Sequence, residues 1–115
     1  MPQIHIDLST LDRLFKGDRV QVVQWVQLYI EEAPGYFERV ESCMTNGDAS
    51  GLSAAAHELR PQAHYLGAPR MLELLIQIGE KAGTEGVAAC AQAVEELLDL
   101  GRQVTAELQS EVLGP

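Results

Sequence analysis

Apolar residues recur along this chain at steps of three and four, the spacing that places side chains on one face of an α-helix. The pattern is clearest between residues 48 and 66, where the apolar face consists of Leu52, Ala55, Ala56, Leu59, Ala63 and Leu66. Similar patterns predict long helices over about residues 18–45, 69–82 and 85–112, and a short helix over about 8–16. Since each helix has an apolar face to bury, the sequence predicts an all-α protein.

The two longest predicted helices have apolar faces that extend along most of their length. The expected buried face of the helix over 18–45 consists of Val23, Val26, Ile30, Ala33, Phe37, Val40 and Met44. That of the helix over 85–112 consists of Val87, Ala91, Val94, Leu98, Gly101, Thr105, Leu108 and Val112. Pro34-Gly35 interrupts the first of these helices, but the apolar spacing keeps its phase across the interruption. We therefore expect a kink at Pro34 and no helix end.

Glycines, prolines and cap residues mark the connections between the predicted helices. Gly17-Asp18, Asn46-Gly47-Asp48 and Gly67-Ala68-Pro69 each combine a helix stop with a helix start, and Gly83-Thr84 is the next expected break. Such short connections between long helices imply antiparallel neighbours. The predicted architecture is an antiparallel up-down four-helix bundle with a short additional N-terminal helix, as a single domain over residues 1–115.

The composition indicates which classes of ligand to exclude and which cellular location to expect. The net charge is −9, and the 8 Lys and Arg residues are scattered, so nucleic acid is not an expected ligand. Cys43 and Cys90 lie on apolar helical faces without metal-site spacing, which indicates reduced core cysteines. No stretch approaches the roughly 20 apolar residues of a membrane span, and residues 1–10 do not have the pattern of a signal peptide. A cytoplasmic location is expected, with no membrane partner.

One histidine lies on the polar side of the helix predicted over 48–66. At about 100° per residue, His57 lies roughly 140° from the centre of the apolar face, and Arg60 follows one turn later on the same flank. Near neutral pH most imidazoles are unprotonated and have a ring-nitrogen lone pair able to attack phosphorus. His57 is therefore either a nucleophile in solvent or simply a polar residue on a solvated face.

The stretch around His57 reads Ala56-His57-Glu58-Leu59-Arg60-Pro61, and Leu66-Gly67-Ala68 follows after four further residues. It resembles histidine phosphotransfer (Hpt) domains, whose signature is Ala-His-x-Leu-Lys-Gly, then four residues, then Leu/Met-Gly-Ala. The match extends over most of residues 18–82. The chain departs from the signature by having Arg60 for lysine, which keeps the charge, and Pro61 for glycine, which alters the helix locally.

This resemblance implies that His57 carries a phosphoryl group between receiver-domain aspartates through its Nε2 atom. The sequence has no phosphate-cradling glycine-rich loop and no carboxylate cluster for magnesium, so it is not expected to be an enzyme or to use ATP by itself. No cofactor or metal of its own is expected, and Mg²⁺ belongs to the partner receiver domain. Arg60 would support the phosphoryl group by charge-assisted hydrogen bonds. His64 is a rival nucleophile, but Gly67, not a base, follows three residues after it.

The expected partners are response-regulator receiver domains and a hybrid or sensor histidine kinase, with the chain itself a monomer. Equal distances from the turn at 46–47 place His57 level with Tyr36, and His64 level with Tyr29. The expected docking residues are Tyr29, Glu32, Tyr36, Ser53, Pro61, His64 and Gly67. Pro61 leaves open a second hypothesis, a degenerate module that binds a receiver or another helical protein without being phosphorylated. A further alternative is that Pro61 ends the helix early.

Overall fold

The computed structural model describes residues 5–114, which form helices joined by short turns and contain no strand. In chain order the elements are α1 (Ser9–Leu14), α2 (Arg19–Thr45), α3 (Ala49–Tyr65), α4 (Pro69–Glu85), the 3-10 helix η1 (Val87–Cys90) and α5 (Ala91–Glu111). The predicted all-α class is therefore confirmed. None of these helices is both long and apolar enough to cross a bilayer, within the residues that the structure describes.

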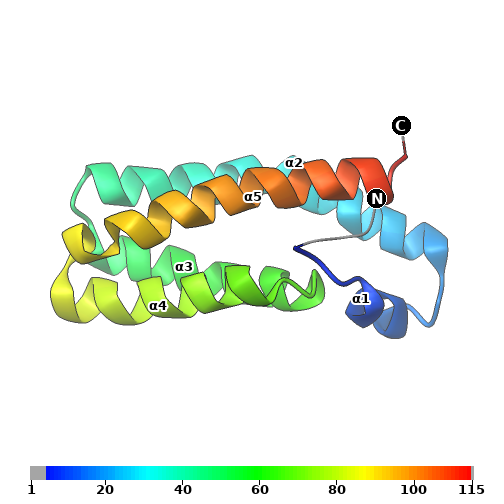
Figure 1. Ribbon diagram of the computed structural model, residues 1–115, viewed down its shortest axis with the longest axis horizontal. Coiled ribbons are helices and arrows are strands. Elements are labelled where there is room, and N and C mark those ends of the chain that lie inside the picture. The colour runs from blue at the N-terminus through cyan, green and yellow to red at the C-terminus, as the bar shows by residue number, and fades with distance from the viewer. Residues whose placement is uncertain (1–4, 115) are drawn as a thin grey trace.

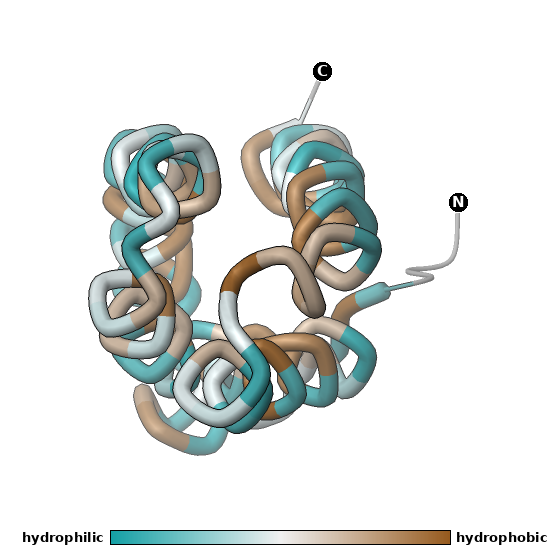
Figure 2. The backbone as a smooth tube through the Cα atoms, turned by 90° about the vertical axis from the view of Figure 1, so that its left-hand side faces the viewer, coloured by the Kyte–Doolittle hydropathy of each residue, from teal (hydrophilic) through white to brown (hydrophobic). Residues whose placement is uncertain are grey.

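The four long helices lie along the long axis of the molecule, with α2 and α5 on one side and α3 and α4 on the other (Figure 1). Helix α3 packs against α2 and α4, and α5 also packs against α2 and α4. The view along this axis in Figure 2 shows the helices arranged around a common centre. Helix α1 lies at one end, where it contacts α2 and α3. This packing leaves the outer flank of α3 and α4 open to solvent.

The ends of the helices follow the cap residues in the sequence. Asp18 accepts hydrogen bonds from the amides of Val20 and Gln21 at 3.1 and 3.3 Å at the start of α2. Asp48 accepts one from the amide of Gly51 at 2.9 Å at the start of α3. Gly47, between α2 and α3, has a φ of +67°, a left-handed conformation that glycine adopts without a steric cost. The hairpin of α2 and α3 is therefore fixed by local chemistry.

The break expected at Gly83-Thr84 is wrong. Helix α4 continues through both residues to Glu85, and the chain turns at Gly86, where φ is +88°. Gly83 stays in the helix because nothing forces it into the left-handed region, whereas Gly86 takes up that conformation and the 3-10 helix η1 follows. Sequence alone could not rank these two glycines.

The buried faces of α3 and α4 agree with the predicted apolar faces, but those of α2 and α5 are rotated by about one residue. In α2, Val22 and Cys43 are buried, whereas Val23 and Met44 are only half-buried. In α5 the buried positions not predicted are Ala93, Leu97, Leu100 and Val104. The rotation follows from packing, because α2 and α5 face each other as well as the α3–α4 pair. Both cysteines are free and buried, and burial raises the pKa of the Cys90 thiol.

Candidate functional site

His57 lies on the outer surface of α3, with its side chain exposed. Its neighbours Ala56 and Leu59 are 0% and 2% exposed and fix the inner face of the helix in the core. The outward position that the sequence predicts for His57 is confirmed. A stiff helix thus presents the imidazole to solvent, where a second molecule can reach it.

Helix α3 continues past His57 through Pro61 to Tyr65. The alternative in which Pro61 ends the helix is therefore wrong. Proline has no amide hydrogen, so Pro61 cannot donate the usual helical hydrogen bond to the carbonyl of His57. The side chain of Pro61 is exposed on the same surface as His57 and remains available to a partner.

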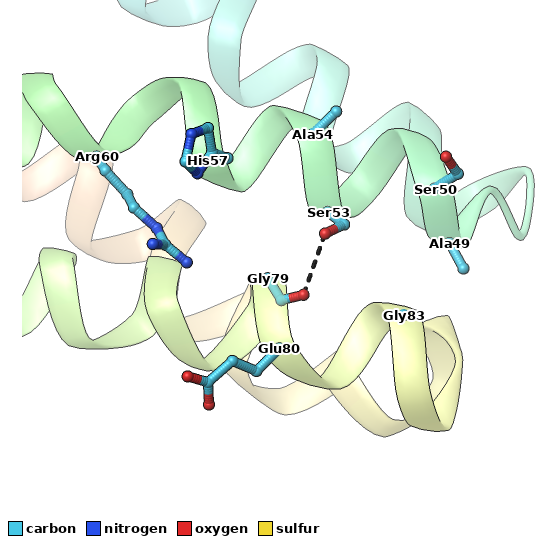
Figure 3. Close-up of a pocket in the computed structure, with 9 residues that line it drawn as sticks. All are labelled: Ala49, Ser50, Ser53, Ala54, His57, Arg60, Gly79, Glu80 and Gly83. Carbon is cyan, nitrogen blue, oxygen red and sulfur yellow. Dashed lines mark hydrogen bonds between the residues drawn. The ribbon is translucent and has the colours of Figure 1, made fainter.

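Arg60 follows His57 by one turn and extends from α3 toward the turn of α4 that carries Gly79 (Figure 3). Its side chain is half-buried, and its Nε atom is enclosed with no hydrogen-bond partner in the part of the chain that the structure describes. Among residues 5–114, no carboxylate forms an ion pair with Arg60. The guanidinium therefore brings to the flank of His57 a positive charge that no described carboxylate holds in an ion pair.

A groove of about 750 Å³ lies between α3 and α4 beside His57. The walls include Ser53, Arg60, Gly79 and Glu80 (Figure 3). The Ser53 hydroxyl donates a hydrogen bond to the carbonyl of Gly79 at 3.1 Å, which joins the two helices across the groove. Ser53, an expected docking residue, thus uses its hydroxyl within the chain, although it still lines the groove.

A second hollow, of about 420 Å³, adjoins the other side of His57 and Arg60. Its lining includes Pro61, His64 and Leu72. His57 and Arg60 border both hollows and therefore stand on a ridge between them. A ridge of this kind lets a convex or flat partner surface approach the imidazole from either side.

The neighbouring turn of α2 adds charged groups to this surface. Arg39 of α2 forms an ion pair with Glu58, the residue next to His57. One turn away, the Tyr36 hydroxyl donates a hydrogen bond to the carboxylate of Glu32 at 2.8 Å. That hydrogen bond, with a smaller effect of burial and of nearby carboxylates, raises the pKa of Tyr36. Glu32 is exposed and Tyr36 is half-buried, and their expected docking role stays a prediction.

Tyr29 is wrong as a docking residue, because its side chain is only 3% exposed. Its ring stacks on Trp25 with centroids 5.8 Å apart, and Trp25 meets the edge of Tyr65 on α3. The Tyr29 hydroxyl is buried and has no hydrogen-bond partner within residues 5–114, and burial raises its pKa above the usual range. The α2 face rotates Tyr29 inward, so it supports the hairpin and does not form the outer surface.

Gly67 approaches a segment of its own chain, which leaves little room for a partner there. Its φ is +59°, and a Cβ at this position would overlap the carbonyl oxygen of Asp7. The amide of Asp7 donates a hydrogen bond to the carbonyl of Leu66 at 2.9 Å. His64 remains exposed and borders a further hollow of about 330 Å³ next to Gly67. Gly67 thus closes the end of the bundle, while His64 stays accessible.

Gly79 and Arg39 are site residues that the sequence reasoning did not identify. A glycine inside an apolar helical pattern carries a cost in helix propensity, and that was the available signal for Gly79. Arg39 had no signal, because it reaches the site only through the register of α2 against α3. Residues 5–114 contain no cluster of three or more His, Cys, Asp or Glu side chains suited to a metal ion.

Comparisons with known proteins are consistent with this geometry. A family model described as the Hpt domain matches residues 24–113, which cover α3, α4, α5 and most of α2. Comparison with curated proteins and with solved structures gave no match in either set.

Proposed function

The chain belongs to the Hpt domain family, whose members take part in phosphorelay signalling, and on that premise we propose that His57 is its phosphoacceptor. In this proposal His57 accepts a phosphoryl group from the aspartyl phosphate of one receiver domain and passes it to the aspartate of another. The observation that carries the assignment is the exposed imidazole of His57 on a rigid helix, bordered by two hollows and by Arg60.

The transfer needs only a nucleophile from this chain. The lone pair of Nε2 forms a bond to phosphorus while the bond between phosphorus and the aspartyl oxygen breaks, and the receiver carboxylate leaves as an anion. The ring proton stays on Nδ1. The onward step is the reverse reaction with a second receiver, since the ring nitrogen is itself a good leaving group. Mg²⁺ on the receiver would neutralise the phosphoryl oxygens, so this chain needs no metal of its own.

Arg60 is proposed to support the phosphoryl group once it is on His57. Its guanidinium lies on the same flank, one turn along, and has no carboxylate partner among the described residues. An arginine can place two parallel hydrogen bonds on phosphate oxygens. Ser53, Pro61 and His64, together with Glu32 and Tyr36 of α2, are proposed to form the surface that a receiver contacts.

The wider setting is part of the same proposal. Consecutive long helices reverse direction along the long axis in Figure 1, which supports an antiparallel up-down four-helix bundle. We place the chain as one domain over residues 1–115, acting as a monomeric phosphoryl carrier in the cytoplasm. Hpt domains are carriers and not kinases, and they work with receiver domains and histidine kinases in two-component systems. The upstream partner is accordingly a hybrid or sensor histidine kinase.

The test mixes the chain with a phosphorylated receiver domain and Mg²⁺ and measures acid-labile, base-stable label. We expect label on the wild-type chain and none on His57→Gln, whereas His64→Gln should still be labelled, at a rate lowered only by the loss of one docking contact. His64 is the matched control because it is also an exposed histidine on α3. Chasing the labelled chain with a second receiver should return the label to an aspartate.

Label that persists in His57→Gln would overturn the assignment of the phosphoacceptor. If no receiver labels the chain, and the His57→Gln variant binds receivers as well as the wild type does, the protein is instead an interaction module without phosphotransfer. The observation that favours this second function is the exposed Pro61 near His57, where the family signature has glycine.

A further inference from the structure

Gly79 of α4 lies across the groove from Arg60 of α3, next to its guanidinium (Figure 3). An ideal Cβ built on Gly79 would lie 3.2 Å from the Nη2 atom of Arg60, which is tighter than an ordinary van der Waals contact. The Ser53 hydroxyl holds the carbonyl of the same residue at 3.1 Å. The guanidinium thus occupies the space that a side chain at position 79 would need.

The position of Arg60 is also chemically unusual. Its Nε atom is enclosed and finds no acceptor among residues 5–114, and burying such a donor normally costs free energy. No carboxylate among the described residues forms an ion pair with its guanidinium. By contrast, Arg39 and Arg70 each pair with a glutamate. A positive charge that is held beside His57 without a partner is suited to an anion that arrives later.

We propose that Gly79 is a positioning residue for phosphoryl retention: the absence of a side chain there lets Arg60 lie across α4 beside His57, where it stabilises the phosphorylated imidazole. This inference rests on the proposed role of His57 as phosphoacceptor. Hydrolysis breaks the bond between phosphorus and nitrogen as water attacks phosphorus, and protonation of the ring assists departure of the imidazole. A fixed guanidinium opposes that protonation and bonds the phosphoryl oxygens, so it slows the loss of phosphate.

The experiment needs no receiver domain. Phosphoramidate phosphorylates an accessible histidine directly: the bond from phosphorus to Nε2 forms, the bond from phosphorus to the amide nitrogen breaks, and ammonia leaves. After removal of the reagent, phosphorus NMR follows the decay of phosphohistidine in the wild type, Arg60→Gln, Gly79→Leu and the double variant. Gly35→Leu is the control, because Gly35 is also helical and a Cβ there meets nothing within 4 Å.

We expect Arg60→Gln and Gly79→Leu each to shorten the phosphohistidine lifetime by about ten-fold, the factor that loss of one partly exposed charge-assisted hydrogen bond supplies. The double variant should decay no faster than either single variant, because both changes remove the same contact. Gly35→Leu should decay like the wild type. A Gly79→Leu variant with a wild-type lifetime, or a double variant with multiplied effects, would overturn the inference.

Two further measurements keep the test decisive. If Gly79→Leu does not fold, as judged by circular dichroism, Gly79→Ala with Gly35→Ala as control replaces it, with a smaller expected shortening. In NMR spectra of the unphosphorylated chain, the Arg60 Nε–H should exchange slowly with solvent, and exchange should become fast when position 79 carries Leu. Slow exchange in both proteins would contradict the proposed packing. If phosphoramidate leaves His57 unmodified, both the proposed function and this inference fail, whereas unaltered lifetimes on a labelled His57 refute this inference alone.

Discussion

The close approach of Asp7 to Gly67 makes a sharp prediction for stability. Substitution Gly67→Ala adds a methyl group that overlaps the carbonyl oxygen of Asp7, at a residue whose φ is +59°. Gly47→Ala is the matched control, because Gly47 has a φ of +67° and a Cβ there meets nothing within 4 Å. Both variants lose stability because alanine is strained at a positive φ, but only Gly67→Ala also has to displace a neighbouring segment.

The magnitudes follow from these contacts. A non-glycine residue in the left-handed region costs about 1–2 kcal/mol, which is the whole expected loss for Gly47→Ala. At Gly67 the segment must also move, and loss of the hydrogen bond from the Asp7 amide to the Leu66 carbonyl adds about 1 kcal/mol. Partial exposure of Ile6 and Leu8, now 6% and 8% exposed, adds about 1 kcal/mol more. We therefore expect a total of about 3–4 kcal/mol for Gly67→Ala.

Urea unfolding followed by far-ultraviolet circular dichroism measures both losses at neutral pH. A loss of about 3–4 kcal/mol is a large part of the stability of a small domain, so the midpoint should fall clearly below that of Gly47→Ala. Equal midpoints for the two variants would refute the reasoning, because the overlap with Asp7 would then cost nothing.

Two further predictions concern single side chains. Tyr29→Phe should raise the free energy of unfolding in urea by about 1 kcal/mol, because it removes a buried hydroxyl that has no partner among the described residues; a loss of stability would show that the hydroxyl is satisfied. Glu96 pairs with Arg70, and this hydrogen bond lowers the Glu96 pKa from its ordinary value of 4.5. The pair therefore stabilises the fold above pH 4.5, and this contribution is lost as the pH falls through the lower pKa of the folded state. Glu96→Gln should therefore flatten the acid side of the curve of thermal midpoint against pH, and an unchanged curve would contradict this.

The sequence predicted α3 and α4 well and α5 less well, for a physical reason. In α3 the apolar positions form one face only, so the buried set could be identified without knowing the neighbouring helices. In α5, Leu97 and Leu98 are both apolar, as are the adjacent pair at 100–101, and two overlapping faces satisfy the helical period. The choice between them depends on where α2 and α4 pack, and that is tertiary information. In α2, Tyr29 and Ile30 are likewise adjacent apolar residues, and for the same reason the sequence placed Tyr29 at the surface although it lies in the core.

For the candidate site, the sequence identified the site residues that lie together on α3 and missed those that other helices bring to it. His57 and Arg60 lie on α3, so their spacing alone placed them on one flank. Gly79 and Arg39 come to this flank from α4 and α2, through contacts that depend on the register of packed helices. The apolar pattern of a single helix does not give the register of that helix against its neighbours. Only the structure could therefore show that these residues lie together.

The ion pair between Arg39 and Glu58 has a consequence for the encounter of this protein with anions. A chain with a net charge of −9 repels them, but counterions in the surrounding atmosphere reduce that repulsion beyond about 8 Å at physiological ionic strength. Inside this distance the carboxylate next to His57 is already neutralised by Arg39, and Arg60 contributes a positive charge. The electrostatic barrier to a phosphate that approaches over the imidazole is therefore smaller than the net charge of the chain alone suggests.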